Sequence, residues 1–382
     1  MANSIYHYEW CYLSGRINIQ ECHLLNTEFF EKLLSGNNLQ YILTNLNNTP
    51  LRDYFTEITH LYEFETRLDD YYHDKLYKIR SLSPYSAVCD FFLIRNDILN
   101  LKKFIKSKIS GLIGNTFLRG TISKDTWDDE WHGKATSLPE IFKELITFCK
   151  KIITQYNHSQ ITLPLLQEGT KKGVQSITPL ISPLSQGRDK RGEKKEALLF
   201  IIDLICDGAY LRYIEKFFYE INVEIIKRYL KMYQLVQGLK IIRRAMILKL
   251  DKNLLDQYFL NRFDKEHVFH KLVLSTTWTS EKTLHEAFVG AYCNTPLPGE
   301  NFVQMLSSNL FPVISFRYEK LADNYLLDLI RPVKFIPFGP ERVFGYLCGF
   351  TVEVFNLKLV LGGKVHRIEE NLLKERLRKT YV

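Results

Sequence analysis

Three short stretches of the sequence contain residue types that could do chemistry. The first, "LGGKV" at 361–365, has the Gly-Lys pair with which a phosphate-binding loop holds a nucleotide. Such a loop also needs a glycine five residues before Gly363 and a Ser or Thr directly after the lysine. Lys358 stands at the first of these positions and Val365 at the second. The sequence therefore excludes a phosphate loop at this place.

The other two stretches pair histidines and group carboxylates. "KEHVFHK" at 265–271 places His267 and His270 three residues apart, but without further ligands nearby an exposed helix edge is favoured over a metal site. "TWDDEW" at 126–131 could suggest acid/base chemistry, yet carboxylates beside tryptophan at a helix start more often cap the helix and offset its dipole. With no nucleophile signature elsewhere, we expect no catalytic residue, no cofactor and no metal.

An internal repeat predicts the elements that would position such residues. "NDILNLKKFIKSK" at 96–108 and "TVEVFNLKLVLGGK" at 351–364 share Asn-Leu-Lys, and a proline lies at the same distance before each, at Pro84 and Pro340. The second copy follows the first by 256 residues, as the shift from 100 to 356 shows. This shift keeps one apolar helix face, with Ile98, Leu101, Ile105 and Ile109 falling on Val354, Leu357, Leu361 and Val365, and it places Asp97 on Glu353.

A fainter middle copy lies between these two. "LVQGLKIIRRAM" at 235–246 follows the first copy by 138 residues, with Gly238 in place of the asparagine. One lysine occurs in all three copies, at Lys102, Lys240 and Lys358. The upstream "NNTPL" ending at Leu51 and "CNTPL" ending at Leu297 repeat in the same order.

The repeat predicts an all-α fold with three similar helical domains, 1–126, 127–264 and 265–382. Only 19 glycines and 12 prolines interrupt 382 residues, which favours helices over strands. The stretch at about 168–195 is rich in Gly, Ser, Pro and Lys and is predicted to be a mobile surface loop. Three equivalent domains could pack around an approximate threefold axis or stack as a short solenoid.

Charge, cysteines and apolar runs narrow the class of protein. A net charge of +8 suits an acidic partner, a nucleic acid or an anionic membrane surface without selecting among them. Seven cysteines without close pairing indicate a reducing cytoplasm and buried thiols. The apolar run at 197–211 is interrupted by Asp203 and Asp207 and is shorter than the roughly 20 residues of a membrane span, so we expect no crossing.

The last 45 residues, "FGPERVFGYLCGFTVEVFNLKLVLGGKVHRIEENLLKERLRKTYV", carry a family resemblance. They resemble the closing segment of the C subunit of V-type (archaeal and bacterial A-type) rotary ATPases, which is equivalent to the d (AC39) subunit of vacuolar proton pumps. The matching positions are Gly339, Glu341, Glu353, Asn356, Leu357, Lys358, Gly363, Lys364, Glu375, Arg376, Leu377, Arg378, Tyr381 and Val382. The first copy matches at Asp97, Ile98, Asn100, Leu101 and Lys102, and the opening helix at Tyr6, Tyr8 and Arg16.

The resemblance implies a non-catalytic central-stalk subunit with three helical domains in a funnel around a pseudo-threefold axis. Such a subunit joins the rotating stalk to the membrane rotor ring and transmits torque for ATP-coupled ion transport. The implied partners are the ring of c/K-type proteolipid subunits, the central-stalk D and F subunits and the membrane stator subunit. The implied location is cytoplasmic and peripheral to the membrane, with no nucleic acid and no small-molecule substrate.

Six basic residues are the candidates for contact with these partners: Lys102, Lys240, Lys358, Lys364, Arg376 and Arg378. The alternative for the three repeated lysines is that each lies along an outer face with its head in water. The basic C-terminal helix could lie near anionic headgroups or an acidic stalk surface, or simply complement its own helix dipole. Two other functions stay open, a helical scaffold of the same fold without a motor and a basic nucleic-acid-binding protein.

Overall fold

The part of the chain that the computed structural model describes is mainly helical. Within the described ranges every regular element is a helix and none is a strand, so the all-α prediction is confirmed. The insertion predicted as a loop at 168–195 lies outside these ranges as far as 189, and its remaining part, 190–195, begins a helix instead. The described residues are 8–36, 39–56, 58, 60–111, 117–158, 190–247, 252–267, 269–270, 273 and 315–382.

The contacts divide the chain into two compact units, each assembled from distant segments. The first consists of Met1–Phe92, Lys216–Tyr233 and Thr295–Val382, and the second of Leu93–Glu215 and Gln234–Asn294. Each unit therefore contains segments from all three predicted domains. The compact units do not coincide with the sequence repeats, and the division into three domains stays a prediction.

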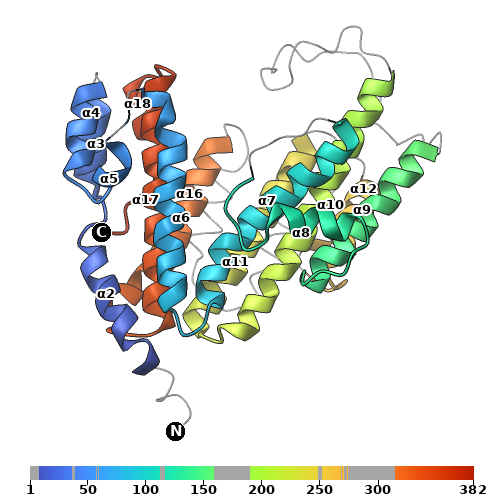
Figure 1. The fold of residues 1–382 in the computed structure, drawn as a ribbon, viewed down its shortest axis with the longest axis horizontal. Helices are drawn as coiled ribbons and strands as arrows, with labels where there is room; N and C mark the ends of the chain where they lie inside the picture. The colour runs from blue at the N-terminus through green and yellow to red at the C-terminus, as the bar shows by residue number, and fades with distance from the viewer. Residues whose placement is uncertain are drawn as a thin grey trace. The chain divides into compact units, whose positions relative to one another are not determined.

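Helix α17 (Pro340–Val365) is the central element of the first unit (Figure 1). Proline suits its first turn, because the N–H that proline lacks would have no helical partner there. Gly339 precedes it with φ 139°, a conformation that glycine adopts without strain. The helix packs against α2 (Cys11–Glu21), α3 (Thr27–Ser35), η1 (Leu61–Glu63), α6 (Phe64–Leu82), α16 (Ser315–Ile330), η4 (Arg331–Phe335) and α18 (Glu370–Arg376).

These neighbours explain why α17 is so apolar. By length and composition alone the helix could cross a membrane, but 72% of its most apolar window is buried inside the protein. Its buried face begins at Glu341 and Arg342 and continues through Val343 to Phe350 without an exposed position. A core helix enclosed by its neighbours has this composition, so packing accounts for it.

The three repeated helices begin side by side in the first unit. They are α7 (Ala87–Ser110), α11 (Glu224–Ile247) and α17. One aromatic ring from each meets the other two, at 6.4 Å between the centroids of Phe91 and Tyr229, 5.6 Å between Phe91 and Phe344, and 5.2 Å between Tyr229 and Phe344. Phe91 and Tyr229 are also related by the shift of 138 found in the sequence. We call these three residues the aromatic triangle.

The second unit is built on the later parts of α7 and α11 and on α10 (Lys190–Glu220). Trp127 of α8 (Lys124–Trp131) is buried and packs edge-on against Phe142 of the next helix, at 5.2 Å between ring centroids. The Ser123 side chain caps α8 by accepting a hydrogen bond from the Thr126 N–H. The other elements of this unit are α9 (Glu140–His158), α12 (Lys252–Tyr258) and η3 (Leu260–Arg262).

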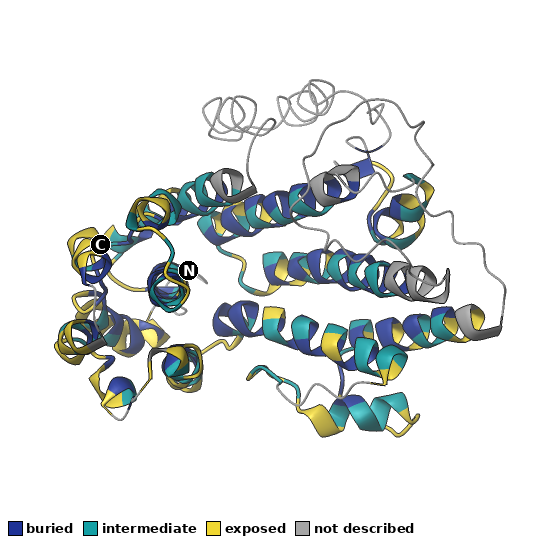
Figure 2. Ribbon diagram, turned by 90° about the horizontal axis from the view of Figure 1, so that it is seen from above, coloured by how far each residue is buried: buried dark blue, intermediate teal, exposed yellow. Residues whose placement is uncertain are grey.

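Apart from the enclosed first half of α17, the described helices mostly have one buried and one exposed side, as the colouring in Figure 2 shows. This is the pattern that the apolar spacing of the repeat predicts. Among the described cysteines four are buried, as expected for structural thiols, while Cys11 at the start of α2 and Cys22 directly after its end are exposed. The short helices α4 (Leu39–Asn47) and α5 (Arg52–Phe55) complete the first unit.

Candidate functional site

The repeated asparagine holds the segment that follows its helix. The side chain of Asn100 donates to the carbonyl oxygen of Leu118 and accepts from the N–H of the same residue, both at 2.8 Å. Asn356 makes the same two bonds with Arg378, both at 3.0 Å. Both asparagines are buried. We call this pair of hydrogen bonds an amide bracket, and its occurrence in two copies explains why the asparagine is repeated.

In two copies the repeated lysine forms an ion pair with a different copy of the repeat. Its partner is an aspartate on the helix that precedes the repeated helix of that copy. Lys358 lies 2.5 Å from the carboxylate of Asp69 on α6, and Lys102 forms a shorter ion pair with Asp207 on α10. Asp207 follows Asp69 by 138 residues, the shift that relates the first two copies. Both partners of the bridge are therefore repeated. The bridges join copy three to copy one and copy one to copy two, which is why the compact units cut across the repeats.

The bridge made by Lys102 is more enclosed than the bridge made by Lys358. Lys102 is 14% exposed and lies 3.9 Å from a second carboxylate, Asp203, which also pairs with Lys106 at 2.7 Å. Lys358 and Asp69 are 37% and 36% exposed. The aspartates that interrupt the apolar run at 197–211 thus serve to anchor α7 on α10.

The middle copy replaces the amide bracket with an aromatic contact. A Cβ atom on Gly238 would lie 2.0 Å from the ring of Phe269, so only glycine leaves room for that ring. Phe269 is fully buried and its centroid lies 5.7 Å from that of Phe259 and 5.0 Å from that of Phe263. Packing of the Phe269 ring against the backbone of Gly238 therefore holds the segment after α11.

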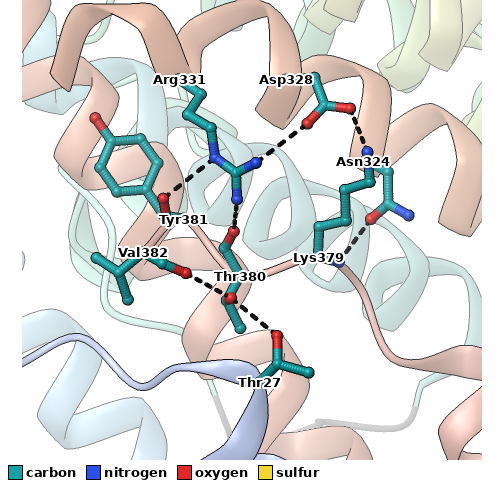
Figure 3. A network of polar contacts seen from close by, with 8 residues as sticks. All are labelled: Thr27, Asn324, Asp328, Arg331, Lys379, Thr380, Tyr381 and Val382. Carbon is teal, nitrogen blue, oxygen red and sulfur yellow. Dashed lines mark hydrogen bonds and ion pairs between the residues drawn. The ribbon is translucent and has the colours of Figure 1, made fainter. Parts of the chain in front are cut away.

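The C-terminal tail, 377–382, is fastened to the first unit by a polar network (Figure 3). Arg331 donates to the carbonyl oxygens of Tyr381, at 3.3 Å, and Thr380. Lys379 donates through its N–H to Asn324 at 2.8 Å. The remaining contacts in the figure join Asp328 to Lys379, at 2.6 Å, and to Arg331, at 3.7 Å. The Thr380 hydroxyl lies 3.2 Å from that of Thr27 and donates to the carbonyl oxygen of Val382 at 2.8 Å.

Two of the six predicted partner-binding residues, Arg378 in this tail and Lys364 in the last turn of α17, bond within the first unit. Arg378 is 7% exposed, pairs with Asp323 at 3.1 Å and lies 4.1 Å over the ring of Phe355. Lys364 donates to the carbonyl oxygen of Leu34, near the end of α3. A cation at a helix C-terminus complements the helix dipole.

The structure thus brings none of the six basic residues together in one exposed patch within the described residues. Lys102, Lys358, Lys364 and Arg378 are each engaged inside their own unit. Lys240 on α11 and Arg376 on α18 are half-buried. Contact of any of the six with a partner stays a prediction.

Buried charge pairs connect α17 to the N-terminal helices. Arg342 pairs with Glu21 of α2, and both side chains are 6% exposed. Burial raises the pKa of Glu21, while Arg342 opposes that rise. Glu353 accepts a hydrogen bond from the Leu25 N–H, and burial raises its pKa to about 7. The repeat shift places Glu353 on Asp97 but indicates a partner for neither carboxylate. In the structure, Asp97 accepts from the Ile122 N–H and the Thr121 hydroxyl.

The three stretches that suggested chemistry have structural roles instead. The carboxylates at 128–130 lie in the second half of α8, so their predicted place at a helix start is wrong; the first turn holds Asp125. Asp128 and Asp129 pair with lysines, at 3.0 and 2.7 Å, and Glu130 bonds Thr136. In the described part of the chain, no three His, Cys, Asp or Glu side chains gather as a metal site.

The predicted histidine pair is half-buried or buried, so the predicted exposed helix edge is wrong. His270 bonds the carbonyl oxygen of Phe263 at 3.1 Å and is 7% exposed. His267 accepts from the Phe269 N–H at 3.3 Å, and burial lowers its pKa to about 4. Both histidines therefore help seat Phe269 beneath α11.

These features define an all-helical repeat protein whose polar residues lock long helices to one another. The particular family follows from a comparison with known families, in which residues 13–376 match the family described as ATP synthase (C/AC39) subunit. The chain belongs to this family. The resemblance found in its closing segment is thereby confirmed over nearly the whole chain. None of the curated proteins matches the sequence.

Proposed function

We propose that this chain is the non-catalytic central-stalk subunit of a V/A-type rotary ATPase, joining the rotating stalk to the membrane rotor ring and transmitting torque for ATP-coupled ion transport. The observation that carries the proposal is the repetition of two locks, the amide bracket and the lysine–aspartate bridge, in a chain of the ATP synthase (C/AC39) subunit family.

A torque-transmitting part needs stiffness, and the locks supply it where apolar packing alone would allow sliding. Packed apolar side chains resist compression, but their contacts are not directional. The amide bracket of Asn356 fixes the tail in one register because both bonds go to a single residue, Arg378. The bridge of Lys358 to Asp69 ties the third copy to the first. Together they oppose rotation of one long helix against its neighbour.

The partners in this proposal are the ring of c/K-type proteolipid subunits, the D and F stalk subunits and the stator, at the cytoplasmic face of the membrane. Exposed aromatic side chains at one end of the first unit are further candidates for a contact surface. Tyr12 is 65% and Phe335 is 86% exposed. Stacking of Trp10 on Tyr85, at 6.3 Å, and the hydrogen bond from Gly339 to Ser14, at 3.2 Å, bring the surrounding segments together.

Reconstitution with purified stalk and ring subunits tests the proposal. We expect the chain to be required for ATP-driven ion transport by the assembled complex, while adding no hydrolytic activity of its own. The double variant Tyr12→Ala, Phe335→Ala should weaken assembly roughly tenfold or more without lowering the chain's stability. Tyr219→Ala, which removes an aromatic side chain that is 80% exposed elsewhere in the unit, is the matched control.

Full ion transport without the chain would contradict the motor role and leave a scaffold of the same fold. Binding to the stalk subunits but not to the ring would contradict the coupling role in particular.

A further inference from the structure

Buried Glu353 and half-buried Lys75 act on each other's charge at the place where the N-terminal helices join α17. Glu353 is 4% exposed, and its carboxylate accepts a hydrogen bond of 2.6 Å from the N–H of Leu25 in the linker between α2 and α3. Residues around the linker and the tail line a space too narrow for a water molecule there. The linker backbone is thus attached to α17 by a carboxylate that is almost wholly removed from water.

Lys75 of α6 supplies the opposing charge from inside an aromatic cage. Its ammonium lies 4.5 Å from the ring centroid of Phe350, 5.3 Å from that of Tyr71 and 5.4 Å from that of Tyr346. It also donates to the Tyr71 hydroxyl at 3.3 Å. Aromatic faces hold a cation with little water. The cage is built from α6 and α17 alone, so Lys75 opposes protonation of Glu353 without itself contacting the linker.

The other ionisable groups near the pair come from every element around it. Tyr71 from α6 and Tyr346 from α17 interact with Glu353. Tyr381 from the tail lines the same narrow space. From α2, Glu21 acts on Tyr346 and is itself held by Arg342. The tyrosines have raised pKa values and stay neutral below pH 9. Burial raises the pKa of Glu353 to about 7 and lowers that of Lys75 to about 8, so both exchange protons near neutrality.

We propose that Glu353 and Lys75 form a proton-linked clasp, in which uptake of one proton by Glu353 tightens the hold of α17 on the α2–α3 linker. When the linker opens, water reaches the carboxylate and removes the cost of its charge. When the linker is closed, a charged carboxylate has lost its water and gained only one N–H and a distant cation. A neutral carboxyl has less to lose by burial, and its oxygen still accepts from Leu25. Acidification therefore favours the closed linker.

The expected size follows from linkage. The pKa of Glu353 is about 7 when the linker is closed and 4.5 is its ordinary value, so closed protein takes up the proton first. Below pH 7 closure gains up to about tenfold per pH unit until the ordinary pKa is reached. Burial in its cage lowers the pKa of Lys75 from 10.5 to about 8, so Lys75 carries its charge throughout the range in which Glu353 titrates. The hold on the linker therefore tightens as pH falls below 7.

Hydrogen exchange at the Leu25 amide measures this hold directly, because that N–H is the donor to Glu353. After correction for the intrinsic exchange rate, we expect protection of a short peptide containing Leu25 to rise roughly twentyfold between pH 7.5 and 5.5 in the full chain. Glu353→Gln keeps an acceptor oxygen and cannot titrate, so its protection should change by less than about twofold over the same range. Asp97→Asn, at the equivalent position of the first copy, is the matched control and should keep the rise at Leu25.

A second variant tests the role of the cation. Lys75→Gln removes the charge that opposes protonation, so the rise should begin at a higher pH than in the original chain. Flat protection at Leu25 in the original chain would overturn the clasp, as would a full rise in Glu353→Gln or an unmoved onset in Lys75→Gln. The inference goes beyond the proposed function and concerns the chain alone, so loss of the motor role would leave it standing.

Discussion

The third and the middle copies of the repeat solve the same problem by different means. After α17 the chain is held by the amide of Asn356, with two hydrogen bonds to Arg378. In α11 the position equivalent to Asn356 is Gly238. The ring of Phe269, from the segment after α11, fills the space that an asparagine would occupy there. One solution is directional and depends on polar atoms, whereas the other depends on shape. A repeat can thus keep its architecture while one copy exchanges hydrogen bonds for packing.

The largest effect should come from removing the ring in the middle copy. Phe269→Ala deletes a fully buried side chain over a glycine that cannot fill the gap, so the second unit should lose about 3–5 kcal/mol of unfolding free energy. Urea unfolding of the purified chain, followed by fluorescence and circular dichroism, gives this value. Phe269→Leu should recover part of the loss. A cost below about 1 kcal/mol for the alanine variant would show that the ring does not replace the bracket.

Removal of the bracket in the third copy should cost somewhat less. Asn356→Leu keeps the side-chain volume but leaves the N–H and the carbonyl group of Arg378 buried without their partner, at about 1–3 kcal/mol for each unsatisfied group. We expect a loss of about 3 kcal/mol in urea unfolding and faster exchange of the tail amides. Asn100→Leu is the matched variant in the first copy. If the tail amides stayed protected, the bracket would not be what holds the tail.

A fall in pH should lower the stability of the middle copy through a histidine beside Phe269. Burial lowers the pKa of His267, which lies beside Phe269, to about 4, while its ordinary value is 6.5. A folded state that prefers the neutral ring keeps its full stability above pH 6.5 and loses stability as the pH falls from 6.5 towards 4. After a discount for its partial exposure, the loss is about 2 kcal/mol. His267→Gln should flatten the fall in stability between pH 6.5 and 4.5, measured by urea midpoints. An unchanged slope would exclude His267 as its source.

The smallest loss of stability should come from removing one of the two lysine–aspartate bridges, and the size of the loss should differ between them. Lys358 and Asp69 are exposed enough that Lys358→Met should cost about 0.2–1 kcal/mol. Lys102 is less exposed and faces two carboxylates, so Lys102→Met should cost more, about 1–3 kcal/mol. Thermal unfolding at low and high salt compares them, and the Lys358 contribution should be the one that salt removes. Equal costs at both positions would mean that burial does not separate the bridges.

The sequence predicted the fold and the repeated positions, but not what those positions bond. The apolar spacing of Leu101 and Leu357 follows from helix geometry, and both are buried. The partner of Asn356 is a backbone 22 residues later, and that of Lys358 is 289 residues away, so neither can be found from local spacing. One signal was available: Asp69 and Asp207 differ by the repeat shift of 138. The exchange of a bracket for Phe269 leaves no such mark, because Gly238 looks like a lost residue until the ring is seen.

The contact between Leu25 and Glu353 also has a consequence for folding during translation. These residues are 328 positions apart, and a ribosome adds roughly 5–20 residues per second, so the first helices wait about half a minute for their partner. During that interval Leu13, Ile17, Leu33 and Leu34, which are buried in the finished protein, have no α17 to cover them. The apolar faces of α2 and α3 therefore stay uncovered by α17 during synthesis, and the first unit is completed only when translation is nearly over.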